Sequence, residues 1–143
     1  MKEYIAPDVF DVLEPIGAPM NIKGKTRYLL FNTRVVKTIQ NHFDAYINDV
    51  LNSMAGNIES YEVVCNTLHL LLLEEIAMYN EEHPLDKKEL DIDLEYIRTR
   101  VVTSNNALAI ANYLVYAFNK QSKKEGEIPS KNVESVEMNV TTK

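Results

Sequence analysis

The sequence contains one cysteine, no tryptophan and only four glycines among its 143 residues. A single cysteine, Cys65, excludes an internal disulfide framework. The most hydrophobic stretch, residues 68–73, is far shorter than the roughly 20 apolar residues that a membrane-spanning helix needs. The N-terminal residues lack a long apolar segment and carry acids early, which a signal peptide does not. These absences predict a globular, cytosolic protein.

Ligand-binding motifs are also scarce, and the sequence predicts no metal and no cofactor. Three histidines are scattered along the chain, and no two have the spacing of a zinc site on one helix. Gly24-Lys25-Thr26 resembles the end of a phosphate-binding loop, but Pro19, which has no backbone N–H, replaces the earlier glycine of that motif. Acids at positions 91, 93 and 95 have the spacing of a calcium loop, but Tyr96 stands where that loop requires glycine.

No residue pattern predicts catalysis. Cys65 lies in an apolar segment, where a buried and inert thiol is expected. His69 lies in the same segment and is predicted to be a satisfied histidine of the core or of an interface. The paired acids Glu74-Glu75 and Glu81-Glu82 would need a pocket that shifts their pKa values to act as acid and base, and nothing indicates one. We therefore predict that the protein is not an enzyme.

The formal net charge of −6, from 15 basic and 21 acidic residues, is unevenly distributed. No acid lies between Glu14 and Asp44, and the cations of that stretch are Lys23, Lys25, Arg27, Arg34 and Lys37. Residues 71–95 instead carry nine acids, among them Glu81 and Glu82, against two lysines. The two patches are either solvated faces or partner-binding surfaces that pair within one fold or, head to tail, between subunits. The acidic total argues against general nucleic-acid binding.

The hydrophobic pattern predicts an α+β protein that is mainly α, with an N-terminal β-hairpin, about four helices and a flexible C-terminal tail. Residues 1–118 are expected to form a single small domain, extended or hairpin-like over 8–31 and helical over 32–118. A strand-like run covers residues 9–13, and Lys23-Gly24 marks the hairpin turn. Residues 119–143 contain no aromatic residue and have the composition of a polar flexible tail.

The helices are placed by caps and breakers. Asn32 or Thr33 is expected to cap one amphipathic helix that continues to Met54, with Gly56 as its stop. A second helix is predicted from Ser60 to the His83-Pro84 dipeptide. Residues 85–102 are ambiguous: residues 90–96 alternate as a strand does, but positions 90, 94, 97 and 101 fit a helix, which we favour. The last helix follows a cap at Thr103 or Ser104, and its predicted apolar stripe is Leu108, Ala111, Val115 and Phe118.

The second helix is apolar on nearly every side in its middle. One face is marked by a regular apolar stripe, and Leu70 and Leu73 lie outside that stripe. A helix of this kind is central in a core or lies in an interface. We therefore hypothesise that Leu70, Leu73 or Ile76 faces a partner helix or another subunit.

The order of elements carries a resemblance to a known family. A hairpin over residues 22–32 runs directly into a helix, and a Leu-rich helix ends in Glu-Glu-His-Pro. The next segment begins Pro84-Leu85-Asp86-Lys87-Lys88-Glu89-Leu90, and the final helix is rich in alanine, with Ala107, Ala109, Ala111 and Ala117 before Asn119. Over residues 20–120 this order resembles the small tail assembly chaperones of long-tailed bacteriophages and prophages.

The resemblance implies a binding protein without catalytic residues. Such chaperones bind the tape-measure protein and tail-tube protein in the host cytoplasm, and they keep apolar, coiled-coil-forming segments soluble until the tube polymerises. Two other classes stay open: a phage structural connector subunit, which would end up in the virion, and a cytosolic regulatory adaptor or antitoxin. An enzyme is the remotest alternative.

Overall fold

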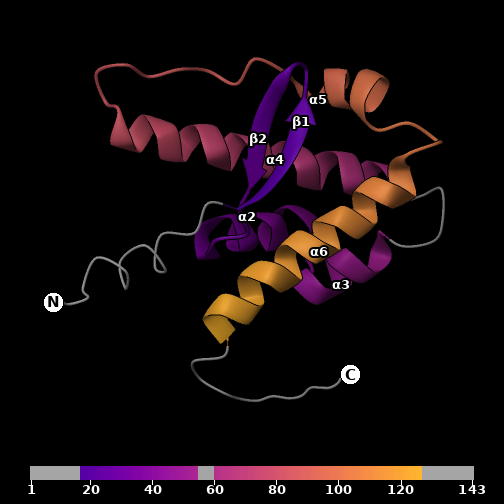
Figure 1. Ribbon diagram of the computed structural model, residues 1–143. Coiled ribbons are helices and arrows are strands. Elements are labelled where there is room, and N and C mark those ends of the chain that lie inside the picture. The colour runs from indigo at the N-terminus through magenta and orange to yellow at the C-terminus, as the bar shows by residue number, and fades with distance from the viewer. Residues whose placement is uncertain (1–16, 55–59, 127–143) are drawn as a thin grey trace, which may run out of the picture.

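The computed structural model describes residues 17–54 and 60–126, and the side chains of residues 122–126 are left out (Figure 1). The described part of the chain starts with an antiparallel hairpin and continues as helices, as predicted. The elements are β1 (Ala18–Ile22), β2 (Lys25–Leu29), α2 (Thr33–Phe43), α3 (Ile47–Ser53), α4 (Ser60–Glu82), α5 (Leu94–Tyr96), the π-helix η1 (Ile97–Val101) and α6 (Ala107–Gly126). The expected strand at 9–13, the stop at Gly56 and residues 127–143 of the expected tail lie outside the described residues.

The hairpin turn lies at Lys23-Gly24, as the sequence predicts. Both residues have positive φ, 54° and 78°, and Ile22 pairs with Lys25 across a two-residue loop. Two successive residues with positive φ form a turn whose twist matches that of the flanking strands. The inner face of β2 is buried through Arg27 and Leu29 and lies over α4, which the hairpin crosses in Figure 1.

The single helix expected from residue 33 to 54 is wrong, because the chain breaks it into α2 and α3. Asp44 adopts a left-handed conformation with φ 53° and ends α2. Gln40 holds the break: its carbonyl oxygen accepts from the Ala45 N–H at 3.2 Å, and its Oε1 accepts from the Ile47 N–H at 2.9 Å. The apolar pattern continues through the break because both helices bury residues against the same core, so periodicity alone conceals it.

The ambiguous segment 85–102 is helical only in its second half. α4 ends at Glu82, just before Pro84, as predicted. Residues 85–93 then form neither helix nor strand, so the helix favoured for that part is wrong. Asp93 caps the helical part, since its carboxylate accepts from the Tyr96 N–H at 2.8 Å, and η1 follows at once. Ile92, buried in the core, anchors the extended segment.

The last helix is longer than predicted. Its start is fixed by a reciprocal cap: Thr103 Oγ1 accepts from the Asn106 N–H at 3.3 Å, and Asn106 Oδ1 accepts from the Thr103 N–H at 2.7 Å. α6 continues to Gly126, so the polar tail does not begin at residue 119. Gln121 is buried, which shows that the fold holds this polar stretch beyond the expected end at Phe118.

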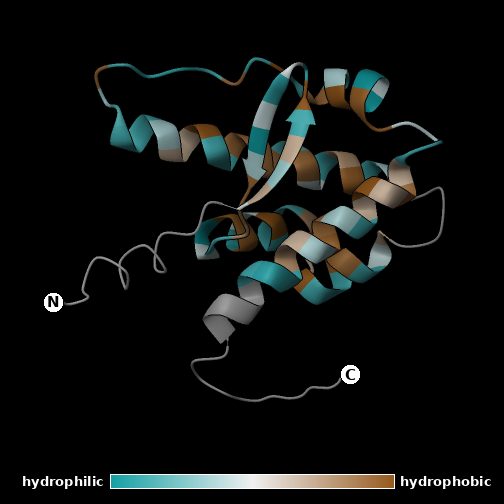
Figure 2. Cartoon of the chain, viewed as in Figure 1, coloured by the Kyte–Doolittle hydropathy of each residue, from teal (hydrophilic) through white to brown (hydrophobic). Residues whose placement is uncertain are grey.

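α4 is the central element of the core. It packs against β2, α2, α3, η1 and α6, and hydrophobic residues recur along its length in Figure 2. Its buried apolar side chains are Val64, Cys65, Leu68, Leu71 and Leu72. The expectation that Cys65 is a buried thiol is confirmed. Within residues 17–54 and 60–126, the structure contains no helix with the length and apolar content of a membrane span.

The cap of α2 yields a stability prediction. Asn32 Oδ1 accepts from the Val35 N–H at 2.8 Å, and Asn32 Nδ2 donates to Glu74 Oε2 at 2.8 Å, so one side chain serves two helices. Asn32→Ala is expected to lower the free energy of unfolding by about 1–2 kcal/mol. Urea denaturation followed by circular dichroism measures the loss. Thr33→Ala, at the exposed neighbouring residue, is the control and should change stability by less than about 0.5 kcal/mol.

Candidate partner-binding groove

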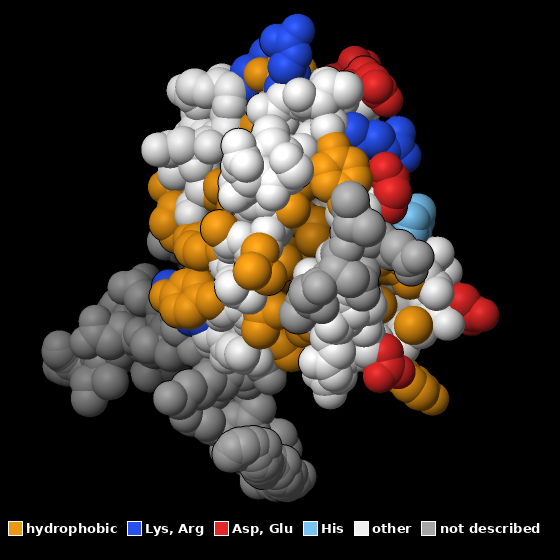
Figure 3. Space-filling view, turned by 90° about the vertical axis from the view of Figure 1, so that its right-hand side faces the viewer, with side chains coloured by type: hydrophobic (Ala, Val, Ile, Leu, Met, Phe, Trp, Pro, Cys, Tyr) orange, Lys and Arg blue, Asp and Glu red, His pale blue; other side chains and the backbone are white. Residues whose placement is uncertain are grey.

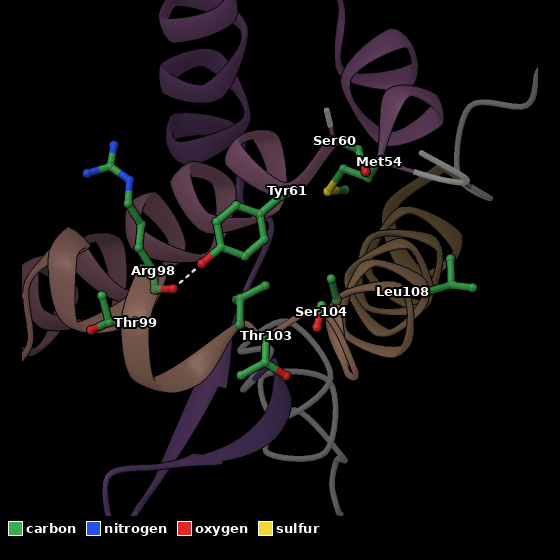
Figure 4. A pocket seen from close by; sticks show the side chains of 10 residues that line it. Met54, Ser60, Tyr61, Arg98, Thr99, Thr103, Ser104 and Leu108 are labelled. Carbon is green, nitrogen blue, oxygen red and sulfur yellow. Dashed lines mark hydrogen bonds between the residues drawn. The ribbon is translucent and has the colours of Figure 1, made fainter. Parts of the chain in front are cut away.

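A groove of about 780 Å³ lies where α3 ends and where α4 and α6 begin. The end of α3 and the starts of α4 and α6 lie on the right-hand side of the molecule in Figure 1, the side that faces the viewer in Figure 3. On that side hydrophobic side chains gather at the middle and charged groups lie toward the edges. The lining residues are Met54, Ser60, Tyr61, Arg98, Thr99, Val102, Thr103, Ser104, Ala107 and Leu108 (Figure 4).

The groove has an apolar floor and a mixed rim. Met54 and Val102 are each only 1% exposed and belong to the core, so they form a fixed floor. Thr103 and Ser104 are exposed and contribute hydroxyl groups to the rim. Leu108 is 56% exposed, which corrects its predicted place in the buried stripe of the last helix. This combination suits a partner that buries an apolar side chain and hydrogen-bonds at its edges.

The π-helix η1 shapes one wall of the groove. A π-turn pairs each N–H with the carbonyl five residues earlier, as the Val102 N–H does with the carbonyl of Ile97 at 2.9 Å. The next carbonyl, that of Arg98, accepts instead from the Tyr61 hydroxyl of α4, the bond drawn in Figure 4. Tyr61 therefore ties the wall to the start of α4.

A second side chain ties the end of η1 to the start of α6. Asn106 Nδ2 donates to the carbonyl of Val101 at 2.9 Å, and Asn106 also completes the cap at Thr103. Side chains that satisfy these carbonyls keep an irregular backbone in a fixed shape. The groove is therefore preorganised, which lowers the entropic cost of binding a partner.

Among the described residues that line the groove, the charged one is Arg98, and it is already paired. Its guanidinium points away from the groove in Figure 4, and Nε lies 3.1 Å from both carboxylate oxygens of Glu62. Glu95 lies 3.5 Å from the same guanidinium. The hydrogen bond to Glu62 raises the pKa of Arg98 above its usual value. The charge of Arg98 therefore joins η1 to α4, and the other described residues that line the groove are uncharged.

Burial favours the neutral form of three titratable side chains of α4. Burial raises the pKa of the Cys65 thiol to about 11, and it raises the pKa of the Tyr61 phenol as well. Burial also lowers the pKa of the half-buried His69. Among residues 17–54 and 60–126, no three His, Cys, Asp or Glu side chains lie close enough to hold a metal ion.

The predicted apolar partner residues of α4 lie outside the groove lining. Leu73 is 40% exposed, whereas Leu70 and Ile76 are half-buried. Leu70 packs against the core. Leu73 is therefore the member of this set with the most surface available to a partner.

The basic hairpin pairs with an acid of the segment that follows α4. Arg27 is 4% exposed and donates to both carboxylate oxygens of Asp91, at 2.8 and 3.1 Å. Lys25 Nζ lies 3.7 Å from the same carboxylate, and Lys23 Nζ donates to the Asp91 backbone carbonyl at 3.1 Å. The charge patches were expected either to be solvated or to pair with each other. These three cations pair within one molecule.

The remaining predicted charges divide into a bound group and a free group. Arg34 contacts the buried Glu74 at 2.7 Å and Glu81 at 2.5 Å, which joins α2 to α4. Lys37 and Glu82 are exposed, and neither forms an ion pair with another residue in the part of the chain that the structure describes. Most cations of the basic patch therefore contact acidic residues of the same molecule.

The groove itself was not predicted from the sequence. Thr103 carries a local signal as a cap, but Met54, Tyr61 and Arg98 come from three separate segments, and no local pattern joins them. Compared with models of known protein families, with curated proteins and with solved structures, the chain gives no match. We therefore infer function from the contacts and charges of the chain itself.

Proposed function

We propose that the protein is a non-enzymatic, protein-binding module that acts as a tail assembly chaperone of a long-tailed phage or prophage in the cytoplasm of the bacterial host. Its proposed partners are the tape-measure protein and the tail-tube protein. The observation that carries the proposal is the preorganised groove, with its apolar floor at Met54 and Val102 and its hydroxyl-bearing rim. A groove of this kind accepts apolar side chains from one face of an amphipathic helix.

Two further features support a binding function. The hairpin, the Leu-rich α4, the Pro84 entry and the Ala-rich α6 stand in the order on which the resemblance to tail assembly chaperones rests. Leu73 and Leu108 expose apolar surface on two different helices. Exposed apolar surface that is not needed by the core is typical of a protein that receives other proteins.

Co-expression tests the proposal and locates the binding face. The full chain, carrying an affinity tag, is co-expressed with the tape-measure protein of a long-tailed phage and captured by the tag. The bound proteins are then identified by mass spectrometry. Leu108→Asp at the groove rim is expected to reduce capture at least tenfold. Binding would remove water from the aspartate carboxylate, and an apolar partner side chain offers that carboxylate no hydrogen-bond donor.

Leu73→Asp is the matched control, since it makes the same change at another exposed leucine. Thermal unfolding of both variants should stay close to that of the wild type. Loss of capture with Leu73→Asp but not with Leu108→Asp would move the binding face to α4. No capture by the wild type, together with the protein in purified phage particles, would favour a connector subunit, and rescue from a co-expressed toxin would favour an antitoxin.

A further inference from the structure

Leu85 is a fully exposed leucine in the loop that follows α4. It lies in the turn from His83 to Asp86, which is closed by a hydrogen bond from the Asp86 N–H to the His83 carbonyl at 2.9 Å. A large aliphatic side chain that is entirely in water contributes nothing to the core of its own chain. Because it lies at the tip of a turn, the whole side chain is available to a second molecule.

The turn that displays Leu85 is held on both sides by side chains of α4. The Tyr79 hydroxyl donates to Asp86 Oδ2 at 2.8 Å, and the Tyr79 ring stacks on His83 with centroids 4.1 Å apart. Asn80 forms two hydrogen bonds with the backbone of Lys88, each 2.8 Å long. The leucine is thus presented on a fixed scaffold, and a fixed scaffold loses little entropy on binding.

A second unpartnered feature lies on the outer face of α6. A shallow hollow of about 540 Å³ is lined by Asn112, Val115, Tyr116, Asn119 and Lys120. Tyr116 is 52% exposed, and its ring lies 5.6 Å from that of Tyr113. The hollow is therefore bordered by an aromatic ring and an aliphatic side chain, with one cation at its end, and it has the size to hold an aliphatic side chain.

The charges around the two features are opposite in sign. Residues 81–89, which surround Leu85, carry four acids and two lysines, a net charge of −2. The charged residue that lines the hollow is Lys120, a cation at its end. We call the exposed side chain of Leu85 the knob. Opposite charge around the knob and the hollow favours their encounter and fixes their relative orientation.

We propose that the hollow on α6 receives Leu85 of a second copy of this chain. Within one molecule the two cannot meet, because the loop after α4 runs along the top of the view in Figure 1 and α6 crosses the lower part. Since the knob and the hollow are different surfaces, the contact is heterologous, and repetition adds molecules head to tail. The contact is independent of the groove and of the proposed chaperone function.

Sedimentation velocity of the full chain at low salt tests this contact. One knob in one hollow buries far less than the roughly 1,200 Å² of a stable interface, so weak association that grows with protein concentration is expected. Raising the salt to about 0.5 M should reduce it, because exposed charges are then screened. Leu85→Asp and Tyr116→Asp should each weaken association at least tenfold, and Leu108→Asp, outside the hollow, should leave it unchanged.

Mixing the two variants gives the decisive measurement. Leu85→Asp keeps its hollow and Tyr116→Asp keeps its knob, so an equal mixture should form dimers and nothing larger. The proposal is overturned if the wild type stays monomeric at low salt and high concentration, if Leu85→Asp associates as strongly as the wild type, or if the mixture forms no dimer. Loss of partner capture without loss of self-association would instead bear on the groove alone.

Discussion

Leu68→Ala is expected to lower the free energy of unfolding by about 3 kcal/mol. Leu68 is 0% exposed at the centre of α4, the helix that contacts the hairpin and most of the other helices. Truncation removes buried methyl groups and leaves a cavity that the surrounding helices and the hairpin cannot close fully. Urea denaturation followed by circular dichroism gives the change in free energy from the shift of the transition midpoint.

Leu73→Ala, five residues along the same helix, is the matched control. Its side chain is 40% exposed, so the same truncation should cost less than about 1 kcal/mol. An equal loss of unfolding free energy in the two variants would contradict the placement of α4, because it would mean that the helix is buried on both sides. The comparison also tests whether Leu73 is free to contact a partner.

Asp91→Ala is expected to lower the free energy of unfolding by about 2 kcal/mol. The substitution leaves the guanidinium of Arg27, which is 4% exposed, without its carboxylate partner. A buried cation without a counter-charge is strongly unfavourable, and the partial exposure of Asp91 keeps the expected loss below that of a fully buried pair. Lys25→Ala removes the exposed cation of the same cluster and should cost less than about 0.5 kcal/mol.

The same ion pair gives the stability a pH dependence. The hydrogen bonds from Arg27 lower the pKa of Asp91 to about 2 in the folded protein, against about 3.9 in an unfolded chain. A carboxyl group with a lowered folded pKa stabilises the fold above pH about 4, and this contribution is lost as the pH falls toward 2. The difference in unfolding midpoint between the wild type and Asp91→Ala should therefore shrink over that interval. A constant difference would show that the charge of Asp91 is not involved.

Local hydrogen bonding and local conformation could be predicted well. Lys23-Gly24 forms the expected turn, Asn32 and Thr103 cap the helices that follow them, and Pro84 follows the end of α4. Each of these features depends on a side chain and backbone groups within a few residues of it. The chemistry of the residue is therefore sufficient to predict the feature.

Features that depend on contacts between distant segments could not be predicted. The break between α2 and α3 follows an uninterrupted apolar pattern, and the extension of α6 to Gly126 runs through a polar stretch that its composition assigns to a tail. In each case packing against the core determines the structure. The core buries residues on both sides of the break between α2 and α3, and Gln121 is buried near the end of α6. Propensity is a weak guide wherever tertiary packing opposes it.

The sequence by itself determined the class of the protein: a hairpin followed by helices, with a central apolar helix and two segregated charge patches. Only the tertiary structure decided how these parts are used. It places Arg27 against Asp91, 64 residues away, and it joins Met54, Tyr61, Arg98 and Leu108 around one groove. The reason is physical: local conformation follows from neighbouring residues, whereas ion pairs and grooves form between segments that only the folded core brings together.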